Sequence, residues 1–288
     1  MNKLLEFFIL LLTIVNGGYG MKMQADIPKN ELGSDTQSVV GTVLETEARK
    51  PVPGEPSMEN LLFTAMQPLG TTMYVWGGGW NEEDTGAGIE AVTIGVSPRW
   101  KEFAAQQDAD YNFKDTEYQI HDGLDCSGYV GWVLYNIFET ENGSGEEDGY
   151  VMKATSMAEA FAGVGWGTYR KASEVTEWKP GDIMSMEGHV WICLGMCGDG
   201  SVLLMHSSPP GVRISGTYMA DGSKSQAVEL AEQCMRKQYP LWFDKYPECG
   251  VKHNYLTTAA QMRWNETLSD EYGIQEMNAY ETVEFLFQ

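Results

Sequence analysis

The spacing of apolar residues changes once along this chain, and the change limits the folds that it can adopt. After Cys126 the spacing is helical, which predicts a helix over residues 127–138 with one buried stripe. From Lys179 the pattern is that of strands: residues 189–196 and 201–206 flank a turn at Gly198-Asp199-Gly200, which predicts a hairpin. Helices followed by strands favour an α+β fold.

Residues with capping side chains mark the starts of further helices. Ser57 is expected to cap a first helix, and Ser97 followed by Pro98 indicates a second. Ser156 and Glu159 have the spacing of a capping box for a third, short helix.

Residues 1–20 have the composition of an export signal. Lys3 supplies a positive start, residues 4–15 are almost entirely apolar, and Gly20 is small enough to precede a cleavage site, with Ala25 as the alternative. The apolar run is too short to span a bilayer, which takes about 20 residues. We therefore expect a secreted protein with no stable membrane insertion after the signal is removed.

The rest of the chain divides into an arm and a folded domain. Residues 21–56 are polar and rich in proline, which predicts a linker or N-terminal arm. Residues 57–288 form the predicted domain, interrupted by a long polar insertion at 80–120 and continued by an extension at 217–288 whose pattern is mostly helical. Because the insertion joins two segments of the candidate site, we expect it to cover one side of the cleft, packed down by Trp100, Phe103 and Tyr111.

The charge of the chain disfavours one class of partner. Asp and Glu number 41 against 19 Lys and Arg, a formal net charge of −22, which repels phosphates. Nucleic acid is therefore not an expected partner.

The five cysteines of an exported chain cannot all pair with one another, so at least one is left over. Cys193 and Cys197 are four residues apart on a predicted strand, too far for a disulfide. Cys234 and Cys249 could pair. We read all four as structural.

Cys126 is the cysteine with a chemically active setting. In Asp125-Cys126-Ser127-Gly128 the thiol lies at a helix N-terminus, which favours the thiolate, and the glycine lets backbone N–H groups approach a developing oxyanion. If the hairpin turns around Asp199, His189 and His206 come close together. His189 is then the expected general base and His206 the group that orients it. A lone buried cysteine or histidine is more often structural, but three such residues converging favour catalysis.

The chain here resembles the NlpC family of bacterial cell-wall cysteine peptidases, which share a papain-like core: a nucleophile-bearing helix packed on a small antiparallel sheet. The resemblance spans about residues 57–216 and rests on five motifs in the family's order: Tyr74-Val75-Trp76-Gly77-Gly78, Asp125-Cys126-Ser127-Gly128, Pro180-Gly181-Asp182, Gly188-His189-Val190 and Met205-His206-Ser207.

The resemblance implies hydrolysis of peptidoglycan stem peptides, typically next to γ-linked D-glutamate, by an enzyme that is secreted or associated with the cell wall. It implies Cys126 as nucleophile, His189 as base and His206 as third member, with no metal and no cofactor. Tyr74 would line the site near the oxyanion, and Asp125 and Ser127 would help to bind a free amine of the substrate.

Two other functions stay open on the sequence. An amidase or acyltransferase would use the same Cys–His pair on the same fold. A non-catalytic cell-surface binding protein is the third reading, which the intact trio of Cys126, His189 and His206 disfavours. His121 and His253 are expected in loops, with zinc binding a minor alternative because no metal-ligand spacing surrounds them.

Overall fold

A computed structural model describes residues 50–80, 87–140 and 149–288, all within the compact unit Thr46–Gln288. The predicted export signal, and the arm up to residue 49, lie outside these residues. No described helix combines the length and the apolar character needed to cross a membrane.

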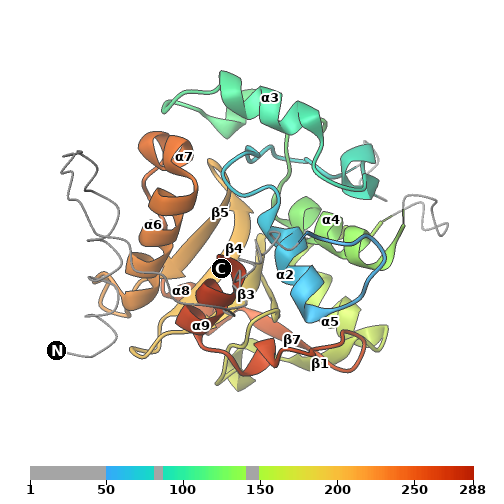
Figure 1. The fold of residues 1–288 in the computed structure, drawn as a ribbon, viewed down its shortest axis with the longest axis vertical. Helices are drawn as coiled ribbons and strands as arrows, with labels where there is room; N and C mark the ends of the chain where they lie inside the picture. Colours follow the sequence, from blue (N-terminus) through green and yellow to red (C-terminus); the bar gives the residue numbers. More distant parts are fainter. Residues whose placement is uncertain (1–49, 81–86, 141–148) are drawn as a thin grey trace, which may run out of the picture. The chain divides into compact units, whose positions relative to one another are not determined.

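A seven-stranded mixed sheet forms the centre of the fold, in the order β1-β7-β2-β3-β4-β5-β6 (Figure 1). Neighbouring strands are antiparallel except β5 and β6, which are parallel. The strands are β1 (Gly167–Arg170), β2 (Ile183–Met186), β3 (His189–Met196), β4 (Val202–Ser208), β5 (Gly211–Thr217), β6 (Gly250–Val251) and β7 (Ala260–Trp264). Since eight α-helices accompany this sheet among the described residues, the predicted α+β class is confirmed. The predicted small antiparallel sheet is wrong, because the sheet has seven strands and is mixed through the parallel pair β5 and β6.

The helices of the first half precede the sheet in the sequence. They are α2 (Met58–Met66), α3 (Pro98–Gln106), α4 (Cys126–Phe138) and α5 (Met157–Gly163), with short 3₁₀ turns at Ile89–Val92, Phe113–Thr116, Ala154–Ser156 and Ala172–Glu174. Helix α4 packs against α2 and against β3 and β4. Ser57 caps α2 by accepting from the Asn60 N–H, as predicted.

The capping box predicted for α5 is wrong. Ser156 is the last residue of the 3₁₀ turn that precedes the helix, has a helical backbone and makes no side-chain cap bond. An N-cap needs an extended backbone to turn its hydroxyl back onto the first turn, so the continuous turn rules out the motif.

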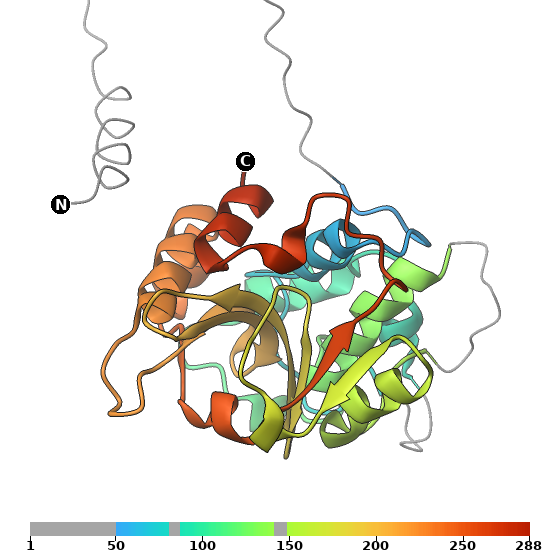
Figure 2. The same cartoon turned by 90° about the horizontal axis from the view of Figure 1, so that it is seen from below.

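The helices of the second half are α6 (Gln226–Gln238), α7 (Pro240–Lys245), α8 (Asn254–Thr258) and α9 (Ala279–Leu286), with a 3₁₀ turn at Ile274–Glu276. The predicted description of residues 217–288 as a helical extension needs a correction. This part of the chain also supplies β6 at the sheet edge and β7, which lies between β1 and β2 (Figure 2). It is therefore an integral part of the central sheet.

Asp182 fixes β7 in the sheet. Its buried carboxylate accepts from the Arg263 Nε and Nη2 (3.0 and 2.7 Å) and from the Gln261 Nε2 (2.7 Å), both on β7. Burial raises the pKa of Asp182, while the Arg263 guanidinium opposes the shift. The Pro180-Gly181-Asp182 motif thus joins the hairpin to the C-terminal strand.

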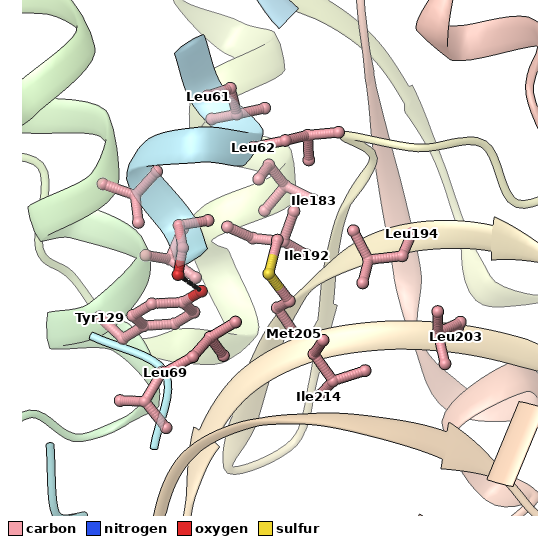
Figure 3. Close-up of a cluster of buried hydrophobic side chains, with 14 of the residues drawn as sticks. Leu61, Leu62, Leu69, Tyr129, Ile183, Ile192, Leu194, Leu203, Met205 and Ile214 are labelled. Carbon is pink, nitrogen blue, oxygen red and sulfur yellow. Dashed lines mark hydrogen bonds between the residues drawn. The ribbon is translucent and has the colours of Figure 1, made fainter. Parts of the chain in front are cut away.

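The two faces of the sheet bury different cores. On one face, strand residues such as Ile192 and Met205 meet Leu61 and Leu62 of α2 and Tyr129 of α4 in the larger core (Figure 3). On the other face, a smaller core under α8 contains Trp191, Leu204 and Leu256, among others. Strand residues alternate between the two cores with the period of two that a pleated sheet imposes.

The described end of the predicted arm is held against the domain. Val52 and Asn60 exchange hydrogen bonds through the Asn60 amide (2.9 and 2.7 Å), and the Gly54 N–H donates to the Asn136 carbonyl (3.1 Å). Residues 52–54 therefore belong to the folded domain, which begins earlier than the predicted residue 57.

Candidate active site

Cys126 is the first residue of α4, as predicted. The Asp125 carboxylate caps the helix by accepting from the Gly128 N–H (2.7 Å), and the Tyr129 N–H donates to the Asp125 carbonyl (2.9 Å). Cys126 thus lies where the unpaired N–H groups and the helix dipole favour negative charge.

A second glycine-rich segment, residues 74–79, packs directly on this helix start. The Asp125 N–H donates to the Gly78 carbonyl (3.1 Å). A Cβ added to Gly128 would lie 2.1 Å from the Gly78 oxygen, and one added to Gly79, whose φ is +90°, would lie 2.6 Å from the Gly128 Cα. Only glycine permits this approach, so two motifs far apart in the sequence form one unit.

The resting Cys126 side chain is a thiol rather than a thiolate. It is only 6% exposed, and burial, followed by the charge of Asp125, raises its pKa to about 12. The Val190 and Ser127 backbone N–H groups act in the opposite direction because they favour the anion. The thiol donates to the Gly188 carbonyl (3.9 Å), the residue before His189. The thiol proton must therefore turn away from this carbonyl before it could pass to His189.

His189 and His206 meet as predicted, with 3.0 Å between His189 Nε2 and His206 Nδ1. Near the tip of the hairpin, the pairing of β3 with β4 matches a turn centred on Asp199. A bulge between Cys193 and Gly195 shifts the pairing by one residue in the part of the hairpin that is nearer the histidines. The two rings are thus diagonal neighbours rather than directly opposite, a distance that long or aromatic side chains can bridge.

Ser215 on β5 completes this row of side chains. Its hydroxyl lies 3.0 Å from His206 Nε2 and is fully buried. If Ser215 accepts from His206 Nε2–H, then His206 Nδ1 must accept from His189 Nε2–H. His189 Nδ1 then carries the free lone pair, which is the tautomer that a general base requires.

Both histidines are held neutral at physiological pH. Burial, followed by the positive charge of Arg213, lowers the pKa of His189 to about 3 and that of His206 well below its usual value. Arg213 is itself buried and forms no described ion pair; it donates to the Ser208 and Gly211 carbonyls. The geometry therefore offers a neutral thiol and a neutral imidazole, a pair suited to general-base rather than ion-pair activation.

The three residues predicted to bind substrate lie together on one wall of a cleft beside Cys126. The Ser127 hydroxyl donates to Asp125 Oδ1 (2.9 Å) and accepts from the Trp80 indole N–H (2.9 Å). Burial raises the pKa of Asp125 to about 6, although hydrogen bonds from Gly128 and Ser127 oppose the shift. Burial also raises the pKa of Tyr74 above its usual value.

The cleft has a volume of about 320 Å³ and is lined by residues from several segments of the chain. Its lining residues up to the start of α4 are Tyr74, Trp76, Gly77, Trp80, Tyr118, Asp125, Cys126 and Ser127. Those that follow α4 in the sequence are Lys153, Ala154, Thr155, Glu187 and Gly188. His189 directly follows Gly188 in the sequence, is buried and is not among the residues that line the cleft.

The insertion borders the cleft at both of its ends, through Trp80 and Tyr118. Tyr118 is 70% exposed and has a φ of +62°, a conformation that is uncommon for aromatic residues and is often found at functional sites. The three aromatic residues predicted to pack the insertion down make such contacts. Trp100 packs edge-on against Trp132 of α4, and Tyr111 contacts Phe103 and donates to the Tyr74 carbonyl (2.7 Å). Residues 81–86 lie outside the described part.

The remaining cysteines and histidines lie away from this arrangement. All five cysteines are free and buried, so the pairing considered for Cys234 and Cys249 is not formed. His121 pairs with Glu90 (3.4 Å), and His253 precedes α8. Among the described residues, no group of three or more His, Cys, Asp or Glu side chains could hold a metal ion.

Four residues of the site escaped the sequence-based prediction: Trp80, Arg213, Ser215 and Tyr255. Trp80 entered it only as a boundary of the insertion. Ser215 on β5 pairs with Leu204 on β4. A prediction of β5 and of its register against β4 would therefore have placed Ser215 next to the histidines. Tyr255 contacts both histidines from α8, and no local pattern announces such a contact.

Comparisons with known proteins do not assign the chain to a family. No protein-family model, no curated protein and no solved structure matches the chain.

Proposed function

We propose that the protein is an exported cysteine peptidase of the NlpC type that hydrolyses peptidoglycan stem peptides next to γ-linked D-glutamate, in the secreted fraction or at the cell wall. The main observation that supports this proposal is that Cys126, at the start of α4, lies close to the sheet that bears the His189–His206 pair. A helix bearing the nucleophile, packed on the antiparallel strands β3 and β4 that bear the histidines, also supports a papain-like core.

The mechanism begins from the neutral pair. After rotation, the Cys126 thiol passes its proton to His189 Nδ1 as the sulfur attacks the scissile carbonyl, and His206 holds the resulting imidazolium through Nε2. Backbone N–H groups at the start of α4 stabilise the oxyanion. His189 then protonates the leaving amine, and water, deprotonated by the same imidazole, releases the acyl group from the sulfur. No metal or cofactor takes part in these steps.

Two alternatives make different products. An amidase or acyltransferase on the same fold would form the same acyl-sulfur intermediate with other donors, or pass it to an acceptor other than water. A non-catalytic surface protein would leave every substrate intact and its thiol unlabelled by a cysteine-directed probe. Purified stem peptides compared with intact glycan strands separate these functions, and we expect hydrolysis of the free peptides.

Asp125 is expected to bind the free N-terminal amine of the substrate. An ammonium gains charge-assisted hydrogen bonds from a carboxylate, and these are lost when the carboxyl is protonated. Because the pKa of Asp125 is raised to about 6, kcat/KM for a free-amine peptide should rise as the pH increases through about 6. Asp125→Asn should remove this rise and lower kcat/KM for the same peptide.

The N-acetylated peptide and the free energy of unfolding provide the controls. Asn caps helices about as well as Asp, and at pH 8 it avoids burying a charge, so the free energy of unfolding should not fall. The acetylated peptide should be cleaved slowly by both enzymes. Equal cleavage of the free and acetylated peptides by both enzymes would mean that Asp125 only caps α4.

A further inference from the structure

Helix α8 carries an aromatic side chain onto the two histidines. The Tyr255 ring centroid lies 5.4 Å from that of His189, 6.3 Å from that of His206 and 6.1 Å from that of Trp191. These separations are typical of packed aromatic pairs. Tyr255 thus covers the side of the His189–His206 pair that faces α8.

The sheet topology puts this helix over the histidines. β6 lies at one edge of the sheet and β7 lies beyond β2, so the chain that joins them must cross β5, β4, β3 and β2. Helix α8 lies within that connection. The path of the C-terminal region, rather than any local motif, therefore sets where Tyr255 lies.

Contacts at both ends hold α8 in place. His253 Nδ1 lies 3.2 Å from the Tyr218 carbonyl before the helix, and β7 begins directly after it. Leu256 and Ala259 are buried in the smaller core. With both ends fixed, the ring of Tyr255 has a defined place against His189.

We propose that Tyr255 is a positioning residue of the active site, whose ring holds His189 against His206 and stabilises the imidazolium formed during proton transfer. A cation within about 6 Å of a ring centroid can be attracted to an aromatic ring, and the His189 ring lies within that distance, with the two ring planes tilted by 54°. The Tyr255 hydroxyl makes no hydrogen bond to another described residue, so the ring carries the effect. This inference rests on the proposed function only where it is tested by peptide hydrolysis.

Alkylation of Cys126 tests this role without any substrate. The rate of modification by iodoacetamide, followed by mass spectrometry of the Cys126 peptide, reports how readily His189 accepts the thiol proton. Tyr255→Leu is expected to lower this rate by about tenfold, because the imidazolium loses its aromatic neighbour. Tyr255→Phe keeps the ring and should retain most of the rate. In hydrolysis, Tyr255→Leu should lower kcat and leave KM unchanged.

Leu256→Ala is the matched control, since Leu256 lies on the same helix and in the same core, and no ring contact joins it to the histidines. It should destabilise the protein and leave the alkylation rate unchanged. An equal loss of rate in Leu256→Ala and Tyr255→Leu, a wild-type rate in Tyr255→Leu, or a loss in Tyr255→Phe as large as in Tyr255→Leu would each overturn the positioning role. If alkylation responds as expected while the wild type cleaves no stem peptide, the proposed function fails and the positioning role stands.

Discussion

Cys126→Ala is expected to lower the rate of stem-peptide hydrolysis by on the order of 10⁴- to 10⁶-fold, as the loss of a covalent nucleophile does in other hydrolases. The neighbouring hydroxyl of Ser127 is not free to replace it, since Ser127 already donates to Asp125 and accepts from Trp80. The measurement is kcat on a purified stem peptide at a saturating concentration.

Variants of the two histidines and of a second buried cysteine should affect kcat to different extents. His189→Ala should be nearly as severe, and His206→Ala milder, because an orienting group contributes less than the base it holds. Cys193→Ala removes a buried thiol from the smaller core and should leave kcat unchanged. Full activity in Cys126→Ala, with an unchanged circular dichroism spectrum, would remove Cys126 from the mechanism.

Asp182→Ala is expected to lower the free energy of unfolding by about 3–5 kcal/mol, because it leaves the Arg263 guanidinium without its buried partner. The Arg263 side chain is 13% exposed, and its other carboxylate partner, Glu177, is 56% exposed and binds it more weakly. β7 would also lose the Gln261 hydrogen bond to the carboxylate. Urea denaturation measures the change.

Glu232→Gln is the matched control for Asp182→Ala. It breaks the Lys224–Glu232 ion pair on the surface, where such pairs contribute less than about 1 kcal/mol. Equal losses of stability in the two variants would mean that Asp182 does not fix the C-terminal strand.

The parts of the fold that depend on local signals could be predicted from the sequence. α4 has apolar residues at helical spacing and an Asp N-cap, and the β3–β4 hairpin has a short glycine turn, so each is specified within about 20 residues. The predicted single buried stripe on α4 is wrong, because every residue from Cys126 to Ile137 is buried. The proximity of Cys126, Asp125 and Ser127 follows from sequence adjacency alone. The proximity of His189 and His206 follows from the hairpin.

The parts of the fold that depend on pairing between distant strands could not be predicted from the sequence. Residues 260–264 form a strand inserted between β1 and β2, a pairing across about 80 to 100 residues of chain that no local pattern encodes. The same pairing draws α8 across the sheet and places Tyr255. The predicted cap of α5 failed for a different, local reason, since the residues directly before the helix form a 3₁₀ turn.

Mass spectrometry of a digested stem peptide tests the central claim most directly. A peptide containing γ-linked D-glutamate, incubated with the wild-type protein in ¹⁸O water, should yield two fragments. Cleavage should fall after the γ-glutamyl residue, with one ¹⁸O atom in its new carboxylate, and Cys126→Ala should leave the peptide intact. An intact peptide after incubation with the wild type, or the same fragments from Cys126→Ala at an equal rate, would contradict the account.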